Sequence, residues 1–352
     1  MYTKLWEAII HNPLITKDNF RDCSTPHEPD GQDFLVAKYH NPRVAVIIPH
    51  HNYSDCIGEA LVSVQQQSHG NFSCLIVDDC SDDAHFRAVQ AEVAGLADSR
   101  FKLVRNAENL GQILSTYRGI DEIDEDFIAI LDPDDRYTPH FLKRMLALHL
   151  NPLIFCPLVC CDEFLLRIGG GITGATYKTD GLDLLQTEIG AAEKLTFQEH
   201  GFHRYFAPTE PGWHWTSTSA MVFRTAALKL LKPQKKLAYK RSVDAYCAYG
   251  AHMLGGSIFL REPLVYRGMH GANSYLDDGL FSMFKNKAKR SFVNVSTIAR
   301  FDAVEAFLAN GGMDLFDRGN VSVVIQAQFS GPELAQLIAA VPQVREILVD
   351  RG

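Results

Sequence analysis

The stretch DFIAILDPDDRYTPHFL, residues 126 to 142, joins a short apolar run to an acidic turn and then to a helix-forming segment. The run from Phe127 to Leu131 has the length and composition of a buried strand, and Asp132, Asp134 and Asp135 follow it directly. Neighbouring carboxylates repel one another and raise one another's pKa, so a chain gains little from them unless a cation or a set of donors lies opposite. The stretch therefore predicts a buried strand that ends in a binding site.

The same alternation of short apolar runs and amphipathic segments begins at Arg43. It is typical of a parallel sheet with crossover helices, so the predicted fold class is α/β, a mostly parallel twisted sheet flanked by helices. In open sheets of this class, ligands bind beyond the carboxyl ends of the strands. The polar residues that follow the four expected strands should therefore share one crevice: His50, His51 and Asn52; Asp78 and Asp79; Asn106 and Asn109; Asp132, Asp134 and Asp135.

Length, charge and cysteine usage narrow the class of protein. The chain has 352 residues, of which 46% are hydrophobic, enough for two domains or for one large α/β domain with an appendage. The formal net charge of −8 argues against a nucleic-acid partner, because such domains are expected to be clearly basic. The eight cysteines are scattered without a CxxC pair, as expected for reduced structural cysteines rather than a zinc site or disulfide framework.

Two further segments bear on localisation. The N-terminal MYTKLWEAIIHNPLITKDNF lacks the basic, apolar and small-residue order of a signal peptide. The apolar stretch from Met145 to Cys161 contains Pro152 and Pro157, which favours a helix end followed by a buried strand over a membrane span. We expect a cytoplasmic protein without a transmembrane segment, and peripheral association with the inner face of the membrane stays open.

The last segment of the chain has two interpretations. Residues 281 to 310 are expected to be helical, whereas residues 321 to 350, VSVVIQAQFSGPELAQLIAAVPQVREILVD, have the strand, helix, strand plan of residues 44 to 78. They could open a second, similar domain, or form a βαβ appendage that packs on the first sheet.

The motifs together resemble the nucleotide-binding half of family 2 glycosyltransferases, which have the GT-A fold and carry a DxD motif. The resemblance is carried by VAVIIPHHNY (44 to 53), LIVDDCSDD (75 to 83), NLGQILSTYRGI (109 to 120) and AILDPDDRYTPHFL (129 to 142), in the family's order and spacing. The segments SAMVFRTAAL (219 to 228), SVDAY (242 to 246) and EPLVYRGMHGANS (262 to 274) resemble the acceptor side, so that the likeness covers most of residues 43 to 275.

The resemblance implies both an activity and a domain plan. It implies an inverting transfer of a sugar from a nucleotide diphosphate donor, most often a UDP-sugar, to a hydroxyl of a carbohydrate or glycoconjugate acceptor, assisted by Mn²⁺ or Mg²⁺. Residues 43 to 150 would form the nucleotide-binding half and residues 151 to 280 the acceptor-side half. Residues 1 to 42 would be an N-terminal extension, and residues 281 to 352 a C-terminal one.

The donor site that the resemblance implies is formed by residues that follow the expected strands. Pro49, His50, His51, Asn52 and Asp79 would receive the nucleotide base, and Gly111 belongs to the same donor-binding set. Asp132 would bind the ribose and, with Asp134, the cation that bridges the diphosphate, with Asp135 close by.

Two more residues are implied to lie near the diphosphate. His270 would occupy the family's additional metal or diphosphate position; the alternative is a plain loop histidine between glycine-containing turns. Arg267 would neutralise phosphate, or it is a surface charge.

Asp244 is implied to be the general base that takes the proton of the acceptor hydroxyl. It is expected just inside a helix that Ser242 could cap, where an acidic residue is also favoured by the helix dipole without any catalytic role. Trp213 and Trp215 are candidate acceptor residues, because aromatic faces pack against sugar rings; aromatic core packing is the competing interpretation.

Three departures from the family pattern leave a second hypothesis about the function open. His50 and His51 replace the common Thr-Tyr, Thr116 replaces a common basic residue, and Val243 leaves Asp244 without a second carboxylate. The rival is a GT-A-like binding or scaffold domain that has lost turnover. A nucleotidyltransferase is a third hypothesis, against which stands the lack of a Gly-rich, basic loop after the first strand.

Overall fold

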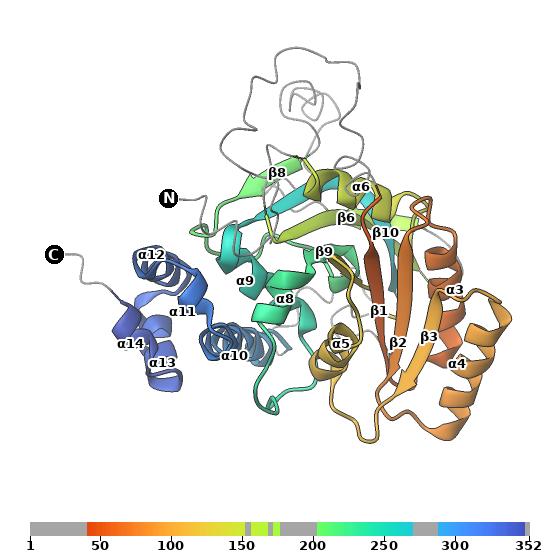
Figure 1. Cartoon of the computed structure of the whole chain (residues 1–352), viewed down its shortest axis with the longest axis horizontal. Coiled ribbons are helices and arrows are strands. Elements are labelled where there is room, and N and C mark those ends of the chain that lie inside the picture. The colour runs from red at the N-terminus through yellow and green to blue at the C-terminus, as the bar shows by residue number, and fades with distance from the viewer. Residues whose placement is uncertain (1–40, 152–155, 168–171, 177–202, 270–287, 349–352) are drawn as a thin grey trace, which may run out of the picture.

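The computed structural model describes residues 41–151, 156–167, 172–176, 203–269 and 288–348, and its centre is one mixed sheet (Figure 1). The strand order is β3-β2-β1-β4-β9-β6-β10-β5, with β7 added beside β6 and β8 beside β10. Helices cover the sheet, so the predicted α/β class is confirmed. The strands are β1 (Val44–His50), β2 (Phe72–Asp78), β3 (Phe101–Arg105), β4 (Phe127–Ile130), β5 (Arg136–Tyr137), β6 (Leu158–Arg167), β7 (Ile172–Thr176), β8 (His203–Phe206), β9 (Met221–Arg224) and β10 (Ser257–Met269).

The first four strands form the parallel part that the sequence predicts. β1 pairs in parallel with β2 on one side and β4 on the other, and β2 pairs with β3. The chain runs outward from β1 to β3 through α3 (Ser54–Gln65) and α4 (Asp83–Gly95), then returns to β4 through α5 (Gln112–Asp121). Right-handed crossovers place α5 on the face opposite α3 and α4, and all four strands therefore end at one edge of the sheet.

The second half of the chain extends the same sheet. β9 lies antiparallel between β4 and β6, and β10 runs parallel to β6. The short strand β5, which directly follows the acidic turn, pairs antiparallel with β10. The return strand β10 consequently ends next to the turn that β4 delivers. The helices of this part are α6 (Phe141–His149), α8 (Thr225–Leu230) and α9 (Val243–Gly255), with a short 3₁₀ turn, η2 (Thr218–Ala220).

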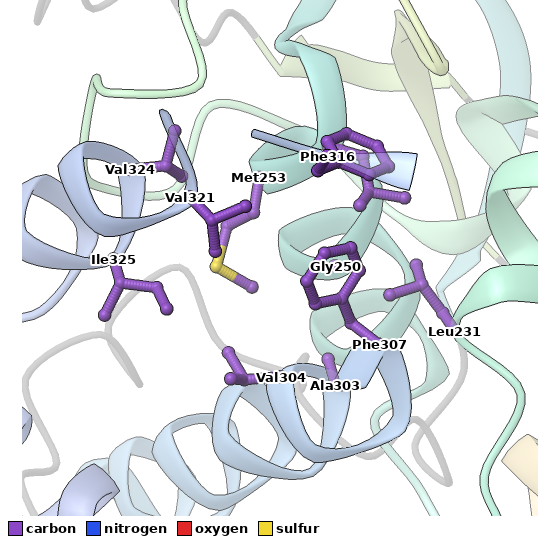
Figure 2. A pocket seen from close by; sticks show the side chains of 11 residues that line it. Leu231, Gly250, Met253, Ala303, Val304, Phe307, Phe316, Val321, Val324 and Ile325 are labelled. Atoms are coloured by element: carbon purple, nitrogen blue, oxygen red, sulfur yellow. The ribbon is translucent and has the colours of Figure 1, made fainter. Parts of the chain in front are cut away.

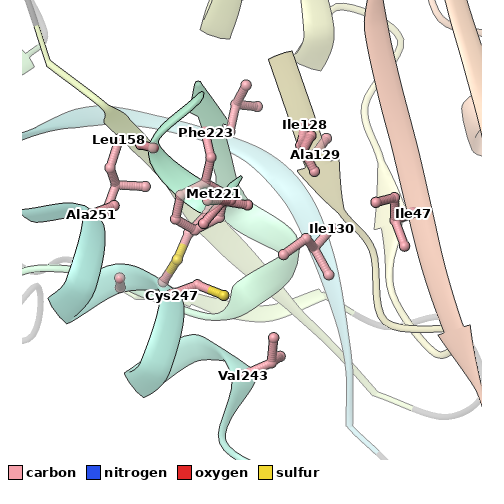
Figure 3. Close-up of a cluster of buried hydrophobic side chains, with 14 of the residues drawn as sticks. Ile47, Ile128, Ala129, Ile130, Leu158, Met221, Phe223, Val243, Cys247 and Ala251 are labelled. Carbon is pink, nitrogen blue, oxygen red and sulfur yellow. The ribbon is translucent and has the colours of Figure 1, made fainter. Parts of the chain in front are cut away.

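One part of the hydrophobic core lies between the strands and α9 (Figure 3). Ile47 and Ile130 come from the parallel strands and Phe223 from β9, while Val243 and Cys247 come from α9, and all five are at most 1% exposed. Burying a side chain of this size contributes about 1.5–3 kcal/mol. The helix that carries Asp244 is therefore fixed to the sheet by its apolar face.

The C-terminal segment is helical, and the strand, helix, strand interpretation of residues 321 to 350 is wrong. The structure has α10 (Ala288–Ala309), α11 (Gly312–Leu315), α12 (Arg318–Gln328), α13 (Gly331–Ala340) and α14 (Val344–Ile347). The β-branched run that suggested a strand buries Val321, Ser322, Ile325 and Gln328, a helical spacing. β-branched residues favour strands only weakly, and burial of one helical face outweighs that preference.

The helices α10 and α12 pack against α9 and leave a small apolar pocket between them (Figure 2). Its walls include Leu231, Met253, Phe307, Phe316 and Val321. None of the residues that line it belongs to the predicted site.

The N-terminus of α12 gives a test of the corrected segment. The Asp317 carboxylate accepts a hydrogen bond of 3.0 Å from the Asn320 amide and so caps the helix. We expect Asp317→Ala to lower the free energy of unfolding by about 1 kcal/mol, as loss of an N-cap does elsewhere. Asp317→Asn, which keeps a capping oxygen, should retain the wild-type value in denaturant titrations. Equal stability of all three proteins would contradict the helix start.

Candidate active site

The strand ends meet as the topology predicts. In the register of the sheet His50 pairs with Asp78, Asp78 pairs with Arg105, and Ile47 pairs with Ile130. The loops that follow β1, β2, β3 and β4 therefore begin side by side at one edge. Successive residues of a strand point to opposite faces, so that only part of each polar cluster can face the crevice.

The acidic turn after β4 brings three carboxylates together. One carboxylate oxygen from each of Asp132, Asp134 and Asp135 lies within 4.8 Å of the other two. Hydrogen bonds fix the turn: the Gln112 side-chain amide donates to Asp132 at 2.8 Å, and the Gly268 amide donates to Asp135 at 2.9 Å. The turn is thus held by α5 on one side and by β10 on the other.

The carboxylates of the turn are electrostatically strained. Burial, together with the charges of Asp134 and Asp244, raises the pKa of Asp132 to about 7. Burial and the charges of Asp134 and Asp132 also hold the pKa of Asp135 well above its ordinary value. Clustered oxygen ligands of this kind are what hard divalent cations bind, and a bound cation would remove the repulsion. The donor set fits Mn²⁺ or Mg²⁺.

Arg267 is not a surface charge. Its guanidinium donates to the buried Glu163 carboxylate at 3.0 Å, and Glu163 also accepts a 2.6 Å hydrogen bond from the Ser217 hydroxyl. Burial lowers the pKa of Arg267, but the negative charges of Glu163 and Asp135 outweigh it and raise that pKa. A permanent positive charge therefore lies behind the acidic turn.

Gly268 allows β10 to approach the turn. A side-chain carbon at this position would lie 2.3 Å from the backbone carbonyl oxygen of Asp134, far inside contact distance. The Ser219 hydroxyl also holds the turn, because it accepts a hydrogen bond from the Asp132 amide at 3.0 Å. The sequence analysis did not identify Gly268, Gln112, Glu163 or Ser219 as site residues. Gln112, Ser219 and Gly268 lie inside the quoted motif segments, which is the signal that marks them.

Asp79 organises the loop between β3 and α5. Its carboxylate accepts from the Asn106 side-chain amide at 2.9 Å and from the backbone amides of Leu110 and Gly111, both at 2.7 Å. A carboxylate has about four acceptor positions, so these three bonds leave one for a further donor. Gly111 has a φ of +89° and packs against the backbone of Lys240. The residue that sequence placed against the base is thus also a structural anchor.

His51 is exposed and fixed at both ring nitrogens. Its Nδ1 lies 3.0 Å from the Asp79 carbonyl oxygen and its Nε2 lies 3.1 Å from the Asn109 side-chain amide. Nδ1 therefore donates, Nε2 accepts, and the faces of the ring carry no hydrogen bond. Lys240 donates to the other end of the Asn109 side chain at 2.6 Å, which ties the loop before α9 to this wall.

The three other members of the predicted base site are placed differently. The His50 side chain is buried and pairs with Asp78, so it points away from the crevice. Pro49 lies inside β1, in register with Val77. Asn52 has a φ of +57° and accepts the Asp82 amide at 2.9 Å, which joins the loops after β1 and β2.

Asp244 lies at the second position of α9, facing the acidic turn closely enough to raise the pKa of Asp132. Ser242 does not cap the helix; it adopts a left-handed conformation with a φ of +78° and makes no capping bond. The Asp244 carboxylate accepts the Ala245 amide at 2.8 Å. Burial raises the pKa of Asp244, and the Ala245 amide and the charge of Arg267 offset part of that rise.

The two tryptophans have different environments. Trp215 is fully buried, edge-on to Tyr249 and His252, so core packing accounts for it and it does not reach an acceptor. Trp213 is half-buried and packs against both Trp215 and Tyr249, with ring centroids 5.2 and 5.6 Å away. Trp213 remains the acceptor candidate of the pair.

Two expectations remain, the role of His270 as a ligand and the lack of a transmembrane segment. His270 lies outside the described residues. Across the parts of the chain that the structure describes, none of the helices combines the length and the apolar character that crossing a membrane requires.

Comparison with known proteins indicates the class of protein to which this chain belongs. The family model described as "Glycosyl transferase family 2" matches residues 45–162. "Putative glycosyltransferase EpsH" of Bacillus subtilis is 32% identical over 272 residues, which cover 76% of this chain and 69% of the relative. "Amylovoran biosynthesis glycosyltransferase AmsB" of Erwinia amylovora is 33% identical over 104 residues, which cover 30% of this chain and 35% of the relative. Among solved structures, TarS 1-349 of S. aureus in complex with UDP aligns with a TM-score of 0.48 and 17% identity, covering 87% of this chain and 83% of that one.

The α/β sheet, the acidic strand end and these relatives define a glycosyltransferase. More narrowly, the chain belongs to glycosyl transferase family 2. The resemblance seen in the sequence is confirmed.

The raised pKa of Asp132 predicts an unusual pH dependence of stability in chelator. Between the unfolded pKa of 3.8 and the folded pKa of about 7, the folded chain holds a proton that the unfolded chain has lost. The free energy of unfolding should therefore fall as pH rises through this window, by at most about 1.4 kcal/mol per pH unit for this group. Asp132→Asn should flatten the fall in thermal or denaturant unfolding.

Asp98 provides the matched control, because its hydrogen bonds with Arg100 lower its pKa to about 2. Its contribution is complete above pH 3.8 and disappears as pH falls toward 2. Asp98→Asn should therefore leave the slope from pH 4 to pH 7 unchanged. An identical slope in wild type and Asp132→Asn would show that the turn does not store this repulsion.

Proposed function

We propose that this glycosyltransferase moves a sugar from a nucleotide diphosphate donor, with UDP as the nucleotide, onto a hydroxyl of a carbohydrate or glycoconjugate acceptor, with inversion and with help from a divalent cation. One observation carries the proposal: three clustered carboxylates, two with raised pKa values, share an edge of the sheet with Asp244. Such a site binds a cation and the diphosphate that the cation neutralises.

The nucleotide would lie over the ends of β1 and β2. The free ring face of His51 suits stacking on a base, and the remaining acceptor position of Asp79 suits a base N–H. Asn52 and the loop at Gly111 close this pocket. These contacts favour a planar base that presents a donor, as uracil does.

The diphosphate would lie at the acidic turn. Asp134, Asp132 and Asp135 would hold the cation, which supplies charge compensation for the departing diphosphate when it is bound. Arg267, held by Glu163 behind the turn, would keep the pocket from accumulating excess negative charge. The donor's anomeric carbon would then face α9.

Asp244 would act as the general base. The acceptor oxygen forms its bond to the anomeric carbon while its proton passes to the Asp244 carboxylate, and the bond from that carbon to the diphosphate oxygen breaks with its electron pair. Burial raises the pKa of Asp244 from the ordinary value of 3.8, which brings the carboxylate closer to the basicity that proton abstraction needs. Attack and departure on opposite faces of the sugar give inversion.

Trp213 would present an aromatic face to the acceptor. The relative from Erwinia amylovora is named for amylovoran biosynthesis. We extend this to a role for this chain in polysaccharide or glycoconjugate synthesis, and we place that role at the cytoplasmic side of the membrane. A binding or scaffold domain without turnover is the second candidate, and the valine at position 243 is the observation in its favour.

Donor binding is tested by titrating UDP into the protein in a calorimeter, with Mn²⁺ or with chelator. We expect cation-dependent binding that Asp134→Ala weakens at least tenfold, because the remaining carboxylates no longer complete the ligand set. Arg118→Ala, a half-buried α5 residue that makes none of the contacts described above, is the control and should bind UDP like wild type. Binding that ignores both the cation and Asp134→Ala would overturn the donor site.

Turnover is tested by UDP release across a panel of UDP-sugars. Asp244→Asn preserves the shape and a hydrogen-bond acceptor but removes the base, so we expect hydrolysis or transfer to fall at least 100-fold while the UDP affinity stays within a few-fold of wild type. UDP binding without release from any donor in the wild type, even with a mixed glycan acceptor pool, would favour the scaffold candidate.

A further inference from the structure

His50, the last residue of β1, is fully buried and uses both ring nitrogens (side-chain exposure 0%). Its Nδ1 lies 3.0 Å from an Asp78 carboxylate oxygen, and its Nε2 lies 3.1 Å from the backbone nitrogen of Tyr53, which donates to it. An amide can only donate, so Nε2 carries no proton and Nδ1 donates to Asp78. The ring is therefore a fixed link between the sheet and the Tyr53 amide.

The carboxylate behind His50 is itself fixed. Asp78 is completely buried at the end of β2, in register with His50 on one side and Arg105 on the other. It accepts the Ser81 amide at 3.1 Å and lies 3.3 Å from the Arg105 guanidinium. Arg105 in turn donates to the Ser81 carbonyl oxygen at 2.5 Å. The row Arg105, Asp78, His50 spans the ends of three neighbouring strands.

The row ends under the loop that would receive the nucleotide. Tyr53 immediately precedes α3, and the two residues between it and His50 are His51 and Asn52, which the proposed function places at the nucleotide. Asn52 adopts a φ of +57°, which non-glycine residues adopt only at some cost, so its conformation depends on its neighbours. The Asn52 amide donates to the Ser81 hydroxyl at 3.0 Å. The loop is consequently held at its first turn by Ser81 and at its end by His50.

We propose that His50 is a positioning residue for the donor: it fixes the backbone of residues 51 to 53 through the Tyr53 amide and does not touch the nucleotide itself. This inference rests on the proposed function, in which His51 and Asn52 contact the base. It also explains the departure from the family's common Thr-Tyr, because a buried imidazole spans from Asp78 to the Tyr53 amide, which a threonine side chain is too short to do.

Two substitutions separate the two ends of the link. The side-chain amide nitrogen of asparagine falls near the position of Nδ1, so His50→Asn keeps the bond to Asp78 and leaves the Tyr53 amide without its acceptor. Glutamine places its oxygen near Nε2, so His50→Gln supplies that acceptor and loses the bond to Asp78. Of the bonds to Asp78 and to the Tyr53 amide, each variant keeps one, and both variants should unfold at lower temperature than wild type.

Donor affinity distinguishes a positioning role from a structural one. With UDP and Mn²⁺ in the calorimeter, we expect His50→Asn to bind at least tenfold more weakly than wild type, because the half-buried Tyr53 amide loses its acceptor and the loop can rearrange. His50→Gln should restore most of the affinity. In donor hydrolysis the loss in His50→Asn should appear as a raised KM with kcat changed much less.

A second buried histidine serves as the control. His149 is 2% exposed, and its Nε2 lies 3.0 Å from the Val222 carbonyl oxygen, on elements that carry none of the site residues. His149→Asn should lower the unfolding temperature and leave the UDP affinity unchanged. Equal loss of affinity in His50→Asn and His50→Gln, or no loss in either, would overturn the positioning role.

Backbone hydrogen exchange separates this inference from the proposed function, because it needs no nucleotide. In the free protein, His50→Asn should speed exchange of the Tyr53 amide at least tenfold, whereas His50→Gln and His149→Asn should leave that amide protected. A wild type that fails to bind UDP while showing this exchange pattern would refute the donor and keep the link. Unchanged exchange in His50→Asn would refute the link whatever the ligand.

Discussion

Buried carboxylates at one edge of the sheet set the constraint on which the rest of this structure depends. The Asp78 carboxylate is hydrogen-bonded to His50 and paired with Arg105, and the Glu163 carboxylate accepts hydrogen bonds from Arg267 and Ser217. The acidic turn after β4 differs, because its hydrogen bonds do not bring the pKa values of Asp132 and Asp135 back to the ordinary range. Asp78 and Glu163 are thus balanced by neighbouring donors, whereas the acidic turn keeps a surplus of negative charge that an external cation would neutralise.

The second half of the chain maintains that surplus. Strand β9 continues the sheet beyond β4, and β10 returns antiparallel to β5, so that the Gly268 amide meets the turn from the side opposite α5. Strands β1 to β4 alone could not hold three like charges together, since like charges separate when nothing fixes their backbone. Strand β10 therefore stabilises the acidic turn that follows β4, which gives a physical reason for both halves to share one sheet.

The sequence predicts the strand ends and the acidic turn because these depend on local patterns: apolar runs, punctuating prolines and clustered carboxylates. It does not predict which of two neighbouring residues faces the crevice, since a one-residue change of phase reverses every side chain. His50 and His51 illustrate this, with one buried against Asp78 and the other exposed. Trp215 and the helix α12 were also beyond local reasoning, because long-range burial decides both.

The lack of a second carboxylate before Asp244 has an explanation in packing. Val243 is 1% exposed and contributes to the core beneath α9, whereas Asp244, one position on and about 100° around the helix, faces the crevice. A charged residue at position 243 would need a buried partner, and Val243 belongs to the buried hydrophobic cluster (Figure 3). The valine therefore reflects how α9 meets the sheet, and it weighs little against the proposed turnover, in which we assign the base to Asp244.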